Sequence, residues 1–168
     1  MDVHMINFAN AMRAAAAIAL LMITPASAQG TKHMSTPILK RHTSAKTHHR
    51  LVLQVNSNDP AMMNLALNNA ANVVQHYKES GEKVSIEVVT FGPGLHMLRE
   101  DTSPVKARIE TLALSTPEIS FKACGNTKEN MSKAENKNIV LIPQAQVVDS
   151  GVVRVMELQE HGWSYVKP

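Results

Sequence analysis

The sequence of 168 residues holds a single cysteine, Cys124, so neither an intramolecular disulfide nor a zinc site with several cysteine ligands can form. Aromatic residues are also few, at 4% of the chain, and charged residues make up only 18%. Together with a hydrophobic content of 44%, this low charge excludes a chain that is disordered throughout. The formal net charge is only +3 and the basic residues are scattered, so nucleic acid is not a predicted partner. The length suits one folded domain with a short additional segment.

The amino-terminal apolar run, residues 14–23, is too short for a membrane-spanning helix, which needs about 20 apolar residues. A basic residue, Arg13, precedes the run, and the small residues of an Ala-Ser-Ala triplet at 26–28 follow it. These are the three parts of a secretory signal peptide. The sequence therefore predicts a signal peptide over residues 1–28, cleavage after Ala28, and residence in the periplasm of a Gram-negative cell without membrane attachment. Because an acidic residue near the start is unusual in a signal peptide, the start of translation is left open between Met1, Met5 and Met12.

Residues 29–49 are rich in serine, threonine, lysine and histidine and have almost no apolar periodicity. Such a segment cannot bury enough apolar surface to offset the entropy lost on ordering, so it is predicted to be a flexible lead-in to a folded domain over residues 50–168. Its histidines leave opportunistic binding of transition metals as an alternative to a plain linker. The linker is favoured because the fixed spacing of a tetrahedral site does not appear among His33, His42, His48 and His49.

Short apolar segments alternate with helical patterns through the rest of the chain. Asp59 followed by Pro60 is a typical start of a helix, and Gly81 is a typical end. The predicted helices cover residues 60–80, 104–114, 125–135 and 150–161. The predicted strands cover residues 51–55, 84–90, 119–124, 145–148 and 163–166. This order predicts an α/β fold with a mostly parallel sheet of about five strands and helices on its faces.

In parallel α/β sheets ligands bind beyond the carboxyl ends of the strands, where three loops of this chain are expected to meet. These loops are residues 56–59, 91–96 and 124–127. The glycines of the second loop allow backbone amides to approach a ligand closely, although an ordinary tight turn is an equal alternative. The loop matches neither a dinucleotide-binding nor a phosphate-binding motif, so nucleotide binding is not supported and no cofactor is predicted. The candidate binding residues are Asn56, Ser57, Gly92, Gly94, His96, Gly125, Asn126 and Thr127.

Cys124 is the strongest candidate for chemistry, because it lies where a predicted strand gives way to a predicted helix. Backbone amides at a helix start and a nearby cation both lower the pKa of a thiol from its usual value of about 8.5. Gly125, Asn126 and Thr127 supply such amides. Lys122, two residues back on the same strand face, is a candidate thiolate stabiliser. The alternative is that Cys124 is a small buried hydrophobic residue, the commonest fate of a free cysteine.

Four short motifs follow one another along the folded part of the chain: Phe-Gly-Pro-Gly at 91–94, Phe-x-Ala-Cys-Gly-Asn-Thr at 121–127, Gly-Val-Val-Arg at 151–154 with Glu-Leu-Gln at 157–159, and Gly-Trp-Ser-Tyr-Val-Lys-Pro at 162–168. In these motifs residues 50–168 resemble the DsrE/DsrF-like (DsrEFH-like) sulfur-relay family, and most closely its exported single-domain branch. The resemblance implies a three-layer α/β sandwich, with helices on both faces of a mostly parallel sheet, and homo-oligomers, often trimers or hexamers. It also implies a persulfide on the cysteine after the third strand, which is Cys124 here.

Four interpretations of function follow, in order of preference. The first is a periplasmic sulfur carrier or thiol-reactive protein, in which Cys124 exchanges a persulfide with a partner protein or a small thiol; any enzymatic activity would be a sulfurtransferase-type relay. The second is a non-catalytic protein that binds a small anion or thiol in the same pocket. The third is soft-metal handling, because thiolate and thioether ligands suit Cu(I), with Cys124, His96 and Met97 as ligands. The fourth is a structural oligomer with an incidental cysteine.

Overall fold

The computed structural model describes residues 47–168. The predicted signal peptide, its cleavage after Ala28 and most of the predicted lead-in therefore lie outside the described residues. Within the described part of the chain, no helix combines the length and the apolar character that crossing a membrane requires. In chain order the elements are β1 (His48–Val55), α1 (Pro60–Glu79), β2 (Lys83–Thr90), the 3-10 helix η1 (Gly92–Leu98), α2 (Lys106–Ser115), β3 (Ile119–Cys124), α3 (Gly125–Glu135), β4 (Ala145–Val148), α4 (Gly151–Glu160) and β5 (Ser164–Val166).

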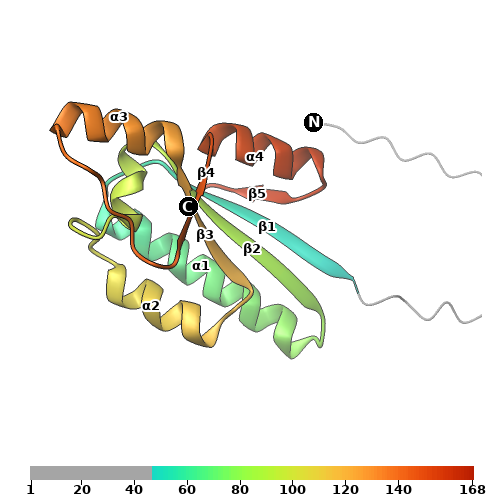
Figure 1. Cartoon of the computed structure of the whole chain (residues 1–168). Coiled ribbons are helices and arrows are strands. Elements are labelled where there is room, and N and C mark those ends of the chain that lie inside the picture. The colour runs from blue at the N-terminus through green and yellow to red at the C-terminus, as the bar shows by residue number, and fades with distance from the viewer. Residues whose placement is uncertain (1–46) are drawn as a thin grey trace, which may run out of the picture. The chain divides into compact units, whose positions relative to one another are not determined.

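The five strands form one sheet in the order β4-β3-β2-β1-β5, and every neighbouring pair is parallel (Figure 1). In the register of this sheet, Leu53 of β1 lies beside Val88 of β2, and Val88 lies beside Phe121 of β3. Because side chains alternate between the two faces of a strand, this register gathers the three apolar side chains on one face. The predicted α/β fold with a parallel sheet of five strands is confirmed.

Helices cover both faces of the sheet, so the fold is a three-layer α/β sandwich. On one face, α1 and α2 bury Leu67 and Ile109 against the sheet in the larger of two hydrophobic clusters. The helix α3 packs against β3 and η1 and adds Met131 to the edge of this cluster. The smaller cluster lies on the opposite face, under α4, and consists of Val52, Val89, Val155 and Leu158.

The direction of the crossovers explains this layering. The connections from β1 to β2, from β2 to β3 and from β3 to β4 all step the same way across the sheet. The connection from β4 to β5 instead steps back across the three central strands. Since parallel crossovers are right-handed, the helix of this return connection, α4, must lie on the face opposite α1 and α2.

Most predicted elements agree with the structure, and the start of α1 shows why. The Asp59 side chain caps this helix by accepting a hydrogen bond of 2.8 Å from the backbone N–H of Ala61, as expected for a helix that opens with Asp-Pro. The strands β3 and β4 have the predicted bounds. The main difference concerns His48 and His49, which were assigned to the lead-in but belong to β1, because they pair with the first residues of β2.

A second difference concerns the segment after β2, for which a loop or a tight turn is predicted and which forms the 3-10 helix η1. Gly92 has a φ of 54°, a left-handed conformation that favours glycine. A Cβ at Gly94 would lie only 2.1 Å from the carbonyl oxygen of Val55. The two glycines therefore turn the chain and let η1 pack directly on the end of β1, a close contact that the sequence pattern did not reveal.

Candidate functional site

Cys124 is the last residue of β3 and the amino-terminal cap of α3. The predicted position of this cysteine, between a strand and a helix, is confirmed. Its Sγ accepts a hydrogen bond from the backbone N–H of Thr127 over 3.4 Å. Only 5% of the residue is exposed, so the thiol lies just beneath the surface at the carboxyl edge of the sheet.

Several hydrogen-bond donors converge on the Cys124 sulfur. Burial of the thiol raises its pKa, because burial disfavours the charged form. The hydroxyl of Thr127 and the backbone N–H groups of Gly151, Thr127 and Asn126 act in the other direction and outweigh burial, so the pKa of Cys124 lies below its usual value. A lowered pKa increases the fraction of thiolate at neutral pH, and the thiolate is the nucleophilic form of cysteine.

The N–H of Gly151 brings a second helix to the thiol, because Gly151 is the first residue of α4. A Cβ at this position would lie 2.9 Å from the Phe91 side chain and 3.2 Å from the Cβ of Cys124. Real Cβ atoms do not approach side-chain atoms as closely as the first of these distances, so glycine is required for this contact. The thiol consequently lies between the amino termini of α3 and α4, where backbone N–H groups favour negative charge.

Thr127 connects the thiol to the loop after β2. The backbone N–H of Gly92 donates a hydrogen bond of 3.0 Å to the Thr127 hydroxyl oxygen. With its oxygen occupied as an acceptor, the hydroxyl can direct its own proton toward Cys124. Two of the three loops that were predicted to form one site, residues 91–96 and 124–127, are therefore joined by a direct hydrogen bond.

The other candidate binding residues contact parts of the chain that adjoin their own loops. The Asn126 N–H also donates to the carbonyl oxygen of Asp149 over 3.1 Å, and a Cβ at Gly125 would lie 3.1 Å from the carbonyl oxygen of Val148. These contacts hold the start of α3 against the end of β4. In the first loop, the Ser57 hydroxyl accepts a hydrogen bond of 3.2 Å from the N–H of Asp59 beside Asn56 and the start of α1.

Lys122 lies on β3 with its ammonium group hydrogen-bonded to the side chain of Gln146 on β4. The donors that lower the pKa of Cys124 come instead from α3 and α4. The role of Lys122 as thiolate stabiliser therefore stays a prediction.

The alternative metal ligands have separate surroundings. The Nδ1 atom of His96 lies 2.8 Å from the hydroxyl oxygen of Thr102, and Met97 is fully buried in the larger hydrophobic cluster. Among residues 47–168, no group of three or more histidine, cysteine or acidic side chains is arranged to hold a metal ion. His96 and Met97 therefore have different surroundings from each other, and the soft-metal site stays a prediction.

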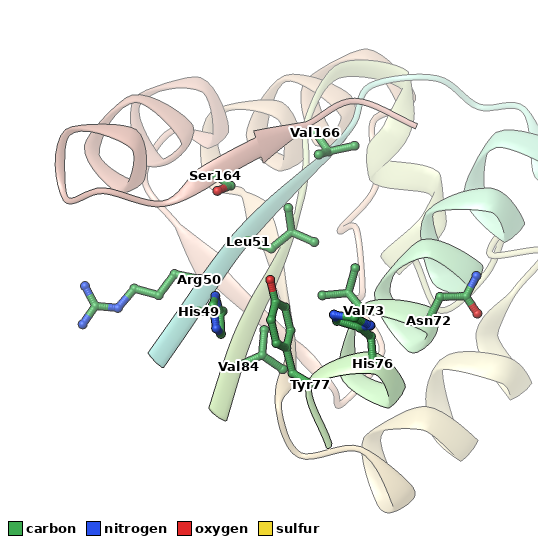
Figure 2. Close-up of a pocket in the computed structure, with 10 residues that line it drawn as sticks. All are labelled: His49, Arg50, Leu51, Asn72, Val73, His76, Tyr77, Val84, Ser164 and Val166. Carbon is green, nitrogen blue, oxygen red and sulfur yellow. The ribbon is translucent and has the colours of Figure 1, made fainter. Parts of the chain in front are cut away.

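An open cavity of about 340 Å³ lies near the amino ends of β1 and β2, whereas Cys124 lies at the carboxyl end of β3. The rings of His49 and Tyr77 stack beside it with their centroids 3.8 Å apart, and the Nε2 atom of His49 lies 2.7 Å from Glu82. Figure 2 shows the Arg50 side chain pointing away from the other lining residues. The sequence analysis missed this cavity, because only the assembly of β1, α1, β2 and β5 creates it. Its lining residues are His49, Arg50, Leu51, Asn72, Val73, His76, Tyr77, Val84, Ser164 and Val166.

Gly151 was not predicted as a site residue, although it occurs in one of the four motifs. Gly151 opens the helix after β4, and β4 is the neighbour of β3 in the sheet. A glycine at a predicted helix start beyond a parallel strand was the signal that could have drawn attention to it.

Comparison with known proteins supports the fold. No family model and no curated protein matches the chain. Among solved structures, the chain is similar to the protein of unknown function MTH1491 from Methanobacterium thermoautotrophicum, with a TM-score of 0.60 and 29% sequence identity. The match covers 71% of this chain and 99% of that chain, so essentially the whole of MTH1491 has a counterpart here.

Proposed function

We propose that this protein carries sulfane sulfur, or otherwise reacts through its thiol, with Cys124 as the reactive residue, in the manner of DsrE/DsrF-like proteins. The observation that carries the proposal is the position of the Cys124 sulfur beside the N–H groups at the starts of α3 and α4, of which the N–H of Thr127 donates a hydrogen bond to it over 3.4 Å. A neutral buried thiol packs as a small hydrophobic residue and needs no such donors. A thiolate, in contrast, is stabilised by each of them.

In the proposed reaction, the Cys124 thiolate attacks the outer sulfur of a donor persulfide, R–S–SH. A sulfur–sulfur bond forms at Cys124, the bond between the two donor sulfurs breaks, and its electron pair leaves with the donor thiolate, R–S⁻. The outer sulfur keeps its proton, so the exchange consumes no oxidant or reductant. Transfer to an acceptor thiolate repeats the exchange with Cys124 as the leaving group, and a thiol of lowered pKa leaves faster.

The proposal extends to the cell compartment and the assembly. A signal peptide cleaved after Ala28 would deliver the protein to the periplasm, where a lone cysteine cannot be protected by an internal disulfide. A homo-oligomer, a trimer or a hexamer, would cover the apolar side chains that α4 exposes to solvent, which include Val152, Val153 and Met156. The partners of the reaction would be a protein or small thiol that donates sulfur and one that accepts it.

The test is the intact mass of the folded protein after incubation with thiosulfate or polysulfide, recorded before and after reduction. We expect a mass increase of one sulfur atom that disappears with reductant and is absent from the Cys124→Ser variant. With thiosulfate, the departing group is sulfite, which can be measured independently. An unchanged mass of the wild-type protein under both donors would contradict sulfur transfer.

A non-catalytic binding protein is the second candidate, and the low exposure of Cys124 favours it. A thiol that is only 5% exposed leaves little room for an outer sulfur, whereas the N–H groups around it could bind a small anion at the surface. This function predicts that thiosulfate or sulfite raises the melting temperature in both the wild type and the Cys124→Ser variant without changing the mass.

A further inference from the structure

An ion pair between α4 and the sheet lies beneath the start of this helix. The side chain of Arg154 reaches down to Glu87 on β2, with Nε donating to Oε2 over 2.9 Å and Nη2 donating to Oε1 over 2.6 Å. Glu87 is only 6% exposed and the Arg154 side chain is 33% exposed, so this two-pronged contact joins a buried carboxylate to a half-buried guanidinium group. Bidentate pairs of this kind fix orientation as well as distance, because the guanidinium and carboxylate planes must match.

The ion pair acts on the first turn of α4. The backbone N–H of Arg154 donates to the carbonyl oxygen of Ser150 over 2.9 Å, which is the first hydrogen bond of the helix. The apolar anchors of α4, Val155 and Leu158, lie further along it. At the helix start, Gly151 packs against Phe91 and Cys124, and Arg154 forms its ion pair with Glu87.

We propose that Glu87 and Arg154 are positioning residues, which hold the amino terminus of α4, and with it the N–H of Gly151, against the Cys124 sulfur. The inference rests on the proposed function of Cys124 as a reactive thiol. The pair acts through the backbone, because its two charges largely cancel at a distance and Gly151, not Arg154 or Glu87, packs against Cys124, with 3.2 Å between a Cβ at Gly151 and the Cβ of Cys124. A loosened pair would let the start of α4 move away, and the thiolate would lose one of its donors.

Other charged groups lie on the elements around the pair and the thiol. Glu157 is the nearest to Arg154 on α4 itself, with 3.9 Å between its Oε2 and Nη1 of Arg154. The substitutions below leave all of them unchanged, so a shift in the titration of Cys124 reports the loss of the pair. The other charged groups on these elements include Lys122 on β3, Lys128 on α3 and Asp149 in the loop before α4.

The experiment measures the rate of iodoacetamide labelling of Cys124 against pH in the folded protein. Arg154→Met removes the tether, and we expect the midpoint of the rate profile to rise by about half to one pH unit, the size of one helix-terminal interaction. Arg154→Lys keeps a single charge contact with Glu87 and should recover part of the shift. Glu87→Gln keeps the shape of the partner but weakens the contact, and it provides the test if Arg154→Met does not fold.

A matched control separates positioning from general loss of stability. Ile109→Val removes one methyl group from the cluster under α2, on the opposite face of the sheet, and should lower the melting temperature without moving the midpoint. If the wild-type midpoint lies near 8.5, the proposed function fails. If the wild-type midpoint is low and remains so in folded Arg154→Met, Arg154→Lys and Glu87→Gln, the positioning role is overturned while the proposed function stands.

Discussion

At the scale of single residues, Cys124 owes its lowered pKa to neighbours that are both close and distant in the sequence. Thr127 and Asn126 follow it within the first turn of α3, but Gly151 is the first residue of α4 and Gly92 is the first residue of η1. Thr127 has a double role, since its hydroxyl oxygen accepts from Gly92 while the same group and its backbone N–H interact with the thiol. The lowered pKa of Cys124 is therefore a property of the assembled site and not of the strand-to-helix junction alone.

The first prediction concerns this hydroxyl group. Replacing Thr127 by valine keeps the size of the side chain but removes the hydrogen bond that lowers the pKa of Cys124, and it leaves the N–H of Gly92 without its partner. We expect the midpoint of thiol labelling to rise by about half to one pH unit, from the usual worth of a hydrogen bond. Thr127→Ser keeps the hydroxyl and should stay close to the wild type; equal profiles for the valine and serine variants would contradict the assignment.

The second prediction concerns the space at Gly151. A Cβ at this position would lie 2.9 Å from Phe91, so Gly151→Ala must push the start of α4 away from the thiol. We expect a loss of about 1–3 kcal/mol in the free energy of unfolding, which is typical of overpacking, together with a raised pKa of Cys124. Chemical denaturation and thiol labelling measure the two effects.

The control for Gly151→Ala is Ser150→Ala at the neighbouring position. The Ser150 side chain makes no capping hydrogen bond to α4, so its loss should leave both measurements nearly unchanged. A Gly151→Ala variant as stable as Ser150→Ala would contradict the prediction, because α4 would then have moved without any loss in the free energy of unfolding.

At the scale of helices and strands, the two helices that begin at the thiol are each held by an arginine. Arg154 holds the first turn of α4 to β2, whereas Arg99 holds the far end of α3, where it bonds Glu135, the last residue of that helix. Arg99 is only 1% exposed and also forms two hydrogen bonds with Asp101, so its charge is fully compensated. Because breaking a buried pair leaves an uncompensated charge, both arginines should matter for stability.

The third prediction follows from the carboxylates around Arg99. Hydrogen bonds from Arg99 and then from Lys137 lower the pKa of Glu135 to about 2, and the same two partners lower the pKa of Asp101 below its usual range. A carboxylate whose pKa is lower in the folded than in the unfolded state stabilises the fold above its unfolded pKa of about 4.3, and this contribution is lost as the pH falls through the folded pKa. The stability of the wild type should therefore decline between about pH 4.3 and pH 2.

Glu135→Gln tests this source of acid sensitivity. The variant removes the charge, so it should be less stable than the wild type at neutral pH and its stability should depend less on pH in the acid range. The measurement is chemical denaturation at a series of pH values from neutral to 2. Parallel curves for the two proteins below about pH 4.3 would contradict the role of this carboxylate.

At the scale of the whole molecule, the two faces of the sheet are covered unequally. One face is covered by α1 and α2, and the other by α4 alone, which buries few apolar side chains and exposes several. The exposed apolar side chains on α4 include Val152, Val153 and Met156, which the proposed homo-oligomer would cover.

The fourth prediction is that the wild type forms a trimer or a hexamer and that Val153→Lys or Met156→Lys reduces its mass in solution. A charge placed in an apolar interface would have to be buried without a partner, which is costly. The measurement is multi-angle light scattering at micromolar concentration. The matched control is Leu114→Lys, since Leu114 is an isolated apolar residue of α2 that is 90% exposed; a wild-type monomer would contradict the prediction.

The parts of the fold that were predicted well are those that local signals determine. The apolar run of β1, the Asp59-Pro60 start of α1 and the alternation in β3 depend on residues that are close in sequence. η1 was missed because its form depends on Gly94 fitting against the backbone of Val55, a contact between separate parts of the chain. The bounds of β1 were missed for the same reason, since pairing with β2 rather than local composition includes its histidines in the strand.

The α/β class, most of the helices and strands, and the place of Cys124 at the end of β3 follow from local signals, because apolar spacing and helix caps act over a few residues. The order of the strands emerges only in the folded molecule, where the return of the chain from β4 to β5 puts α4 on its own face of the sheet. That return brings Gly151 to Cys124 and Arg154 to Glu87. These contacts join residues that are far apart in sequence and meet only when the sheet has assembled, so no local pattern contains them.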